Sequence, residues 1–215
     1  MLMHQAEHLS DLMVYCKSQG VLLIQDEVFV GFGRTGTLFA ADQLSERPDI
    51  MCFSKGLTGG TMPMGITTCT EDLYQAFYSD EKKMALFHGH SFTASPIACA
   101  ASLASLDLLL LESTQAKIKD ITDWHSEFAE ELKGYENAKN VRQTGTILAF
   151  DWETKTETSY FNKVQEKLFN EFMKRGILLR PMGNVLYILP PYCTEKEDLE
   201  YTYQQIFELL KNNDI

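Results

Sequence analysis

The sequence has no long unbroken run of apolar residues: no window approaches the roughly 18 that a membrane-spanning helix needs. Residues 1–12 also lack the basic segment and apolar stretch of a secretory signal. Basic residues are scarce, 19 Lys and Arg against 30 Asp and Glu, which gives a net charge of −11. A surface of that sign does not favour nucleic acids or anionic membranes. We therefore expect a cytoplasmic protein that binds neither.

The five cysteines form no C-x-x-C pair and no regular framework, so we expect reduced thiols rather than disulfides. His88 and His90 stand two residues apart, but no third ligand is evident, and a metal site needs three or four. We therefore expect no metal site. The 215 residues, 45% hydrophobic and 23% charged, are an ordinary globular composition that allows one large or two small domains.

Two short apolar runs each end in a reactive residue and are followed by glycine-rich segments. Residues 21–25 lead to Asp26, and residues 50–54 lead to Lys55. Buried parallel strands have this pattern, and ligands of such sheets bind beyond the carboxyl ends of the strands. We predict that Asp26 and Lys55 share one crevice. A lysine can hold an aldehyde cofactor as a Schiff base while a carboxylate keeps a pyridine nitrogen protonated, which indicates pyridoxal phosphate.

The segments around this pair resemble class III aminotransferases over almost the whole chain. The resemblance rests on the order and spacing of residues 23–28, 31–36, 48–50 and 54–60. Within that family, residues 57–64, 88–93, 180–183 and 187–192 are most similar to the diaminopelargonic acid aminotransferases of biotin synthesis.

The resemblance implies an α/β fold. It would comprise the carboxyl-terminal part of the large domain of a fold type I pyridoxal phosphate enzyme, with a mostly parallel sheet and helices, and a small α+β domain. The family carries about as much sequence again before the first strand, including the phosphate-binding turn and the aromatic that stacks on the cofactor. We therefore expect this chain to be the carboxyl-terminal half of a longer enzyme and to be inactive alone.

The implied reaction converts 8-amino-7-oxononanoate to 7,8-diaminononanoate in a homodimer. The usual amino donor of this subfamily is S-adenosylmethionine, with lysine as an occasional one. Two alternatives remain: another class III ω-aminotransferase, of the ornithine or 4-aminobutyrate type, or a noncatalytic fragment.

The resemblance also implies the role of each site residue. Lys55 would hold the cofactor and move the substrate proton, and Asp26 would pair with the ring nitrogen. Ser91 would reach the cofactor phosphate of the partner subunit, and Arg180 would hold the substrate carboxylate. The remaining substrate contacts would be Gly89, Arg34 and Tyr187, although Arg34 could equally be a surface residue and an aromatic such as Tyr187 is more often part of the core.

Two neighbouring features have other interpretations. Side chains of adjacent strand residues point to opposite faces, so we expect Glu27 to brace a loop or cap a helix rather than face the ligand of Asp26. Gly31-x-Gly33-x-x-Gly36 matches the dinucleotide-binding fingerprint literally, but that site needs an acidic residue at the end of the next strand, where Lys55 stands. We therefore do not expect a dinucleotide site.

The hydrophobic pattern also predicts the elements and the domains. We expect helices over residues 4–18, 38–44, 71–78, 96–111, 117–132, 160–174 and 195–211, the fourth of them buried. We expect strands at residues 21–25, 50–54, 64–68, 146–152, 177–179 and 185–189, and a strand and loop over 85–92. The predicted boundaries give a partial large domain (1–113), a linker helix (114–134) and a small domain (135–215).

Overall fold

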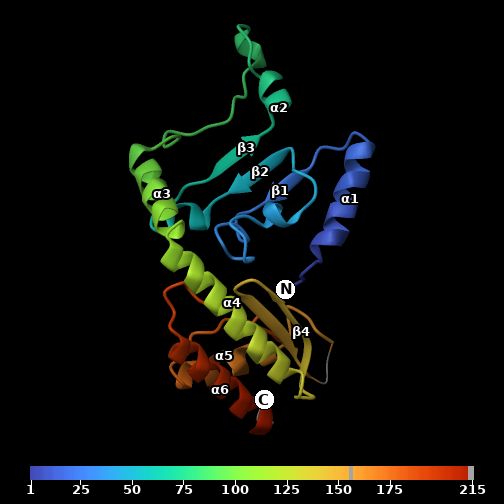
Figure 1. Ribbon diagram of the computed structural model, residues 1–215, viewed down its shortest axis with the longest axis vertical. Helices are drawn as coiled ribbons and strands as arrows, with labels where there is room; N and C mark the ends of the chain where they lie inside the picture. The colour runs from blue at the N-terminus through green and yellow to red at the C-terminus, as the bar shows by residue number, and fades with distance from the viewer. Residues whose placement is uncertain (155–156, 213–215) are drawn as a thin grey trace. The chain divides into compact units, whose positions relative to one another are not determined.

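The computed structural model describes residues 1–154 and 157–212 (Figure 1). The chain forms two compact units. The first is His4–Thr114, and the second joins Met1–Met3 to Gln115–Ile215.

The first unit is built on a three-stranded sheet of order β1-β2-β3 (Figure 1). Helix α1 (Ala6–Ser18) is followed by Gly20, whose φ of +71° favours glycine and turns the chain away from the helix. The strands are β1 (Ile24–Asp26), β2 (Ile50–Phe53) and β3 (Ile66–Cys69), and the short 3-10 helix η1 (Ala40–Gln43) lies between β1 and β2. Strands β1 and β2 are parallel, as predicted, whereas β3 is antiparallel to β2.

Short helices and one long helix complete the first unit. They are η2 (Lys55–Thr58), α2 (Glu71–Gln75), η3 (Lys82–Met84) and α3 (Pro96–Leu109), the last with proline in its first turn. The predicted strand within residues 85–92 is wrong. This segment satisfies its backbone locally, for example through the bond from His88 N to Leu86 O of 2.9 Å, and it pairs with no neighbouring strand among the described residues.

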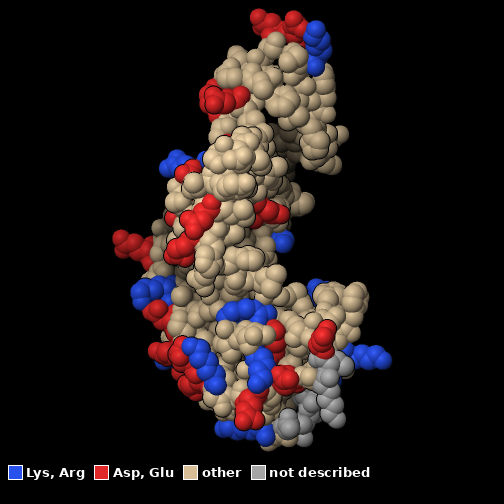
Figure 2. Space-filling view, turned by 90° about the vertical axis from the view of Figure 1, so that its right-hand side faces the viewer, with Lys and Arg blue, Asp and Glu red and all other residues tan. Residues whose placement is uncertain are grey.

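The core of the first unit is small. All of this unit is described, and its buried hydrophobic residues are Phe53, Ala98 and Leu109. The prediction that the helix of residues 96–111 is buried is therefore wrong for this chain, because Leu103 and Leu108 are each 64% exposed. Much of the surface of this unit toward the top of Figure 2 carries neither Lys and Arg nor Asp and Glu. The same unit exposes large hydrophobic side chains such as those of Leu103 and Leu108, and an exposed apolar surface is typical of a face that another polypeptide covers.

The second unit has a complete core between an antiparallel sheet and three helices. Its helices are α4 (Glu112–Leu132), which belongs to this unit from Gln115 onward, α5 (Val164–Lys174) and α6 (Lys196–Asn212). The sheet has the order β4-β5-β6, with β4 (Ala138–Thr144), β5 (Ile147–Trp152) and β6 (Val185–Ile188). Phe150, Phe172 and Ile206, from β5, α5 and α6, are fully buried in one cluster. Each such side chain contributes about 1.5–3 kcal/mol of hydrophobic stabilisation.

Two predicted features of the second unit differ from the structure. Strand β4 was not predicted, and the predicted strand 177–179 does not form. Ile177 and Leu179 are buried and Leu178 is 75% exposed, so the alternation is real, but Ile177 N bonds to Phe172 O of helix α5 at 2.9 Å instead of to a strand. Arg180 therefore follows an irregular segment rather than a strand.

Within the described residues no single helix has both the length and the apolar composition of a membrane span. Helices α3 and α4 meet that composition only together, across the bend between them. No cluster of three His, Cys, Asp or Glu side chains suited to a metal ion occurs in the same residues.

Candidate functional site

The structure brings Asp26 and Lys55 to the same edge of the first sheet. Asp26 is the last residue of β1 and lies opposite Cys52 of β2, and Lys55 is the third residue after Cys52. Neighbouring strands lie about 4.8 Å apart, so the two residues follow adjacent strand ends, as predicted. Both are exposed to solvent.

The carboxylate of Asp26 is oriented by its own turn. Its Oδ1 accepts a hydrogen bond of 2.9 Å from the backbone N–H of Val28, two residues further on. This Asx-turn begins the irregular segment after β1 and fixes the direction of the side chain.

Lys55 has an unusual backbone conformation and an aromatic neighbour. Its φ is +46°, in the left-handed region, which costs a residue other than glycine on the order of 1–3 kcal/mol and is enriched at functional sites. Its Nζ lies 5.4 Å from the centroid of the Phe29 ring, within range of a cation–π interaction. The preceding Ser54 is fixed by a bond of 2.6 Å from its hydroxyl to Met64 O. The sequence analysis missed Phe29, because an aromatic in a glycine-rich turn gives no signal of which side chain it meets.

Glu27 braces the connection between β1 and β2, as predicted. Its side chain is fully buried, and its carboxylate accepts hydrogen bonds from Ala41 N (2.8 Å), Ala40 N (3.1 Å) and Gln25 Nε2 (2.8 Å). These donors include the first N–H groups of η1, where a negative charge is favourable. Of the two adjacent acids, Asp26 is therefore the one that faces outward.

The glycine-rich segment after β1 is a series of turns. Gly33 and Gly36 have φ values of +93° and +92°, and Gly33 N bonds to Leu38 O at 3.0 Å. The element that follows is the four-residue η1, whereas a dinucleotide site places a full helix directly after its glycines. The structure agrees with the prediction that this is not a dinucleotide site. Arg34 lies half-buried on one of the turns.

Gly89 and Ser91 lie in the exposed segment between η3 and α3. The backbone there is held by bonds from His90 N to Thr93 Oγ1 (3.0 Å) and from Phe92 N to His90 Nδ1 (3.1 Å). His90 thus stabilises a turn, and His88 and His90 do not lie on a strand. The roles of Gly89 and Ser91 stay predictions.

Arg180 and Tyr187 belong to the second unit. Arg180 is exposed and precedes the buried Pro181, and it makes no ion pair within the described residues. Tyr187 is half-buried in β6, opposite Ala149 of β5. Their roles as substrate contacts also stay predictions.

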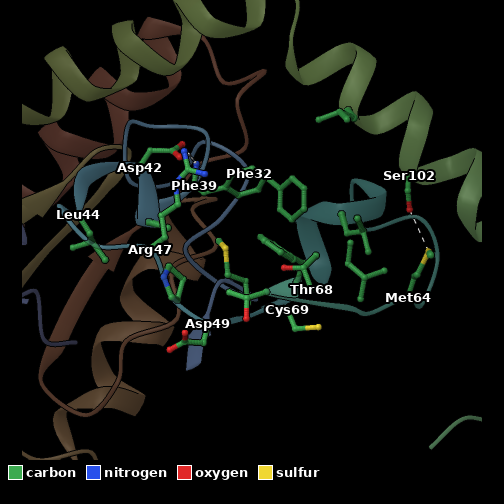
Figure 3. Close-up of a pocket in the computed structure, with 18 of the residues that line it drawn as sticks. Phe32, Phe39, Asp42, Leu44, Arg47, Asp49, Met64, Thr68, Cys69 and Ser102 are labelled. Atoms are coloured by element: carbon green, nitrogen blue, oxygen red, sulfur yellow. Dashed lines mark hydrogen bonds between the residues drawn. The ribbon is translucent and has the colours of Figure 1, made fainter. Parts of the chain in front are cut away.

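A cavity of about 980 Å³ lies on the sheet of the first unit (Figure 3). Strands β2 and β3, helix α3, Phe32 and Phe39 line it, and within the part of the chain that the structure describes neither Asp26 nor Lys55 is among its lining residues. Ser102 donates a hydrogen bond of 3.3 Å to the sulfur of Met64 at its rim. The cavity therefore adjoins the turn that carries Lys55, through Phe32, Phe53 and Leu57, without including the Asp26–Lys55 pair itself.

The chemistry of the strand-end pair fits pyridoxal phosphate. An exposed primary amine can hold the cofactor aldehyde, and an exposed carboxylate on the next strand can pair with a protonated ring nitrogen.

Comparisons with known proteins agree with this fit. Residues 1–210 match the family Aminotransferase class-III. An adenosylmethionine-8-amino-7-oxononanoate aminotransferase of Synechococcus elongatus is 41% identical over 210 residues, which cover 98% of this chain and 49% of that protein. A protein of the same name from Methanocaldococcus jannaschii is 35% identical, over 93% of this chain and 45% of that protein.

Solved structures give the same result. The crystal structure of the aminotransferase of that name from Methanocaldococcus jannaschii has a TM-score of 0.88 at 31% identity, covering 97% of this chain and 50% of that one. An (S)-enantioselective omega-transaminase from Thermomicrobium roseum has a TM-score of 0.84 at 27% identity, covering 94% of this chain and 45% of that one. The chain spans about half the length of the curated relatives it matches, and it belongs to the class III aminotransferases.

Proposed function

We propose that this chain forms part of a pyridoxal phosphate-dependent aminotransferase that converts 8-amino-7-oxononanoate to 7,8-diaminononanoate in biotin synthesis. The observation that carries the proposal is the Asp26–Lys55 pair at the ends of two adjacent parallel strands, in a chain 41% identical to an aminotransferase named for that substrate. The proposed amino donor is S-adenosylmethionine, and the proposed assembly is a cytoplasmic homodimer.

Lys55 and Asp26 would have different roles in the reaction. The amine of Lys55 binds the cofactor and then carries the proton to and from the substrate carbon. The carboxylate of Asp26 would pair with the ring nitrogen of the cofactor and hold its proton. When bound, pyridoxal phosphate supplies a ring that accepts the electron pair released at the substrate carbon.

Substrate and phosphate recognition would use residues beyond the Asp26–Lys55 pair. The guanidinium of Arg180 matches the fork of a carboxylate, so it would hold the acid end of 8-amino-7-oxononanoate. Arg34, Gly89 and Tyr187 would complete the substrate contacts. The hydroxyl of Ser91 would donate to the cofactor phosphate of the partner subunit.

The test uses a reconstituted enzyme, in which this chain is joined at Met1 to the amino-terminal part of the Synechococcus elongatus relative that it does not match. We expect it to form 7,8-diaminononanoate from 8-amino-7-oxononanoate and S-adenosylmethionine, as measured by mass spectrometry. Lys55→Ala should abolish product formation. Lys83→Ala, a change at an exposed lysine of the same unit, should leave it unchanged.

A second candidate is another class III ω-aminotransferase, which the structural likeness to an omega-transaminase favours. Assays of the reconstituted enzyme with ornithine and 4-aminobutyrate separate the two. Faster turnover of either compound than of 8-amino-7-oxononanoate would contradict the proposed substrate.

A further inference from the structure

We infer that Phe32 is a positioning residue for Lys55: its side chain occupies the space next to Gly56 and so holds the backbone of Lys55 in the conformation that aims the amine. The inference rests on the proposed role of Lys55 and adds a residue to which the sequence analysis gave no role.

The contact between Phe32 and Gly56 is tight enough to exclude any side chain at position 56. A Cβ added to Gly56 would lie 2.9 Å from Cδ2 of Phe32, 3.0 Å from its Cβ and 3.1 Å from its Cγ. The Phe32 side chain thus fills the position that a residue-56 side chain would need. Gly56 directly follows Lys55, so the contact acts one peptide bond from the amine-bearing residue.

Both sides of this contact have left-handed backbone. Phe32 has a φ of +60° and Lys55 a φ of +46°, and the chain has only two further residues other than glycine with positive φ in its described part, Ala94 and Asn140. Such conformations persist only where the surrounding structure holds them. Phe32 contacts Gly56, the residue next to Lys55, so the two left-handed residues lie on either side of this contact. This arrangement indicates that the turn after β1 and the turn after β2 hold each other in place.

Other contacts keep both partners fixed. The Phe32 ring packs edge-on against Phe39 (centroids 5.6 Å apart) and Phe53 (6.0 Å), and Phe32 and Phe39 can be seen in Figure 3. On the other side, the Ser105 hydroxyl of α3 donates to Gly56 O at 3.2 Å. Gly56 is therefore held between α3 and the aromatic cluster, and it cannot shift without moving the Phe32 ring.

The same turn also reaches the side chain of Lys55. Phe29, three residues before Phe32, places its ring 5.4 Å from Lys55 Nζ. The segment that begins at Asp26 thus contacts Lys55 at its amine and, through Gly56, at its backbone. Displacing Phe32 should therefore disturb the direction of the amine more than displacing Phe39, which is part of the same ring cluster but is absent from the atoms nearest to Gly56.

The experiment compares Phe32→Leu with the matched control Phe39→Leu in the reconstituted enzyme. Each variant is treated with pyridoxal phosphate and then borohydride, and peptide mapping measures the label on Lys55 relative to the exposed Lys83. We expect Phe32→Leu to slow labelling of Lys55 by about 10- to 100-fold and Phe39→Leu to leave it within about twofold of the parent. Both variants remove ring contacts from one cluster, so both should lower the melting temperature.

A second pair keeps the test decisive if Phe32→Leu does not fold. Gly56→Ala places a Cβ against Phe32 and should also slow labelling of Lys55. Gly65→Ala places its Cβ 3.5 Å from Phe53 O, an ordinary contact, and should not.

The outcomes separate this inference from the proposed function. If the parent enzyme is not labelled preferentially on Lys55, the proposed function fails and the role of Phe32 fails with it. If the parent is labelled there but both members of a pair label alike, whether fast or slow, the proposed function stands and the role of Phe32 is refuted.

Discussion

A buried histidine should make the second unit sensitive to acid. The His125 side chain on α4 is fully buried, and its Nδ1 lies 2.6 Å from the Tyr203 hydroxyl of α6, with which it shares a hydrogen bond. Burial lowers the pKa of His125 from 6.5 to about 4, against a smaller opposing effect of a hydrogen bond with the Thr146 backbone. Burial also raises the pKa of Tyr203, so both groups are neutral at pH 7.

The sign and size of the effect follow from proton linkage. Between pH 6.5 and 4 the unfolded chain binds a proton at His125 that the folded chain excludes, so stability is fully present above pH 6.5 and falls as the pH drops. At about 1.36 kcal/mol per pH unit, the whole interval amounts to about 3 kcal/mol. At pH 5, where most carboxylates are still ionised, about 2 kcal/mol of this loss should already be visible.

The chain offers a selective probe for the measurement. Its two tryptophans, Trp124 and Trp152, both lie in the second unit, so the fluorescence change during urea unfolding reports on that unit. The double variant His125→Phe/Tyr203→Phe removes the titrating group together with its side-chain partner, so the buried Tyr203 hydroxyl is not left without that partner. We expect its free energy of unfolding to change between pH 7.5 and 5 by about 2 kcal/mol less than that of the parent.

The control is His8→Gln, a change at an exposed histidine of the first unit, which should reproduce the parent curve. An equal pH dependence in the parent and in the double variant would show that His125 does not titrate as its burial requires.

Three further predictions concern the candidate site and the chain as a whole. Asp26→Asn should keep the cofactor bound in the reconstituted enzyme yet lower turnover by several orders of magnitude, because an amide cannot stabilise a protonated ring; near-normal turnover would make Asp26 structural. Glu27→Ala should destabilise the first unit by about 2–4 kcal/mol, because it removes a buried carboxylate that accepts three hydrogen bonds, and hydrogen exchange at residues 40 and 41 should rise; unchanged exchange would refute the brace. The 215-residue chain alone should form no diaminononanoate and should elute from a size-exclusion column as an associated species, because its first unit exposes residues such as Leu22, Ile24 and Leu103; an active monomer would contradict both expectations.

The sequence predicted best where local pattern and strand geometry coincide. The apolar runs before Asp26 and Lys55 and the glycines that follow them located both strand ends and their parallel pairing. Because successive side chains of a strand point to opposite faces, the sequence also predicted that Asp26 and Glu27 have different roles. The helical spacing of apolar residues predicted α1, α4, α5 and α6, because each of these helices carries an apolar stripe along one face.

The hydrophobic pattern did not predict strands correctly where pairing depends on a partner elsewhere in the chain. Residues 177–179 alternate correctly, but Ile177 N bonds to helix α5, and β4 is polar in sequence yet pairs with β5. The apolar residues of α3 predicted burial, but burial requires a covering surface, and none of the described elements covers Leu103 or Leu108.

The sequence by itself predicted which residues would carry the proposed chemistry, because an amine at Lys55 and a carboxylate at Asp26 are properties of the residues and of their spacing. Only the tertiary structure decided how they are held. The Phe32 contact at Gly56 and the buried brace of Glu27 join segments that are separate in the sequence, and the left-handed backbone of Lys55 lies directly beside the first of these contacts. Hydrogen bonds and steric contacts of that kind arise from the packed fold, and no local pattern encodes them.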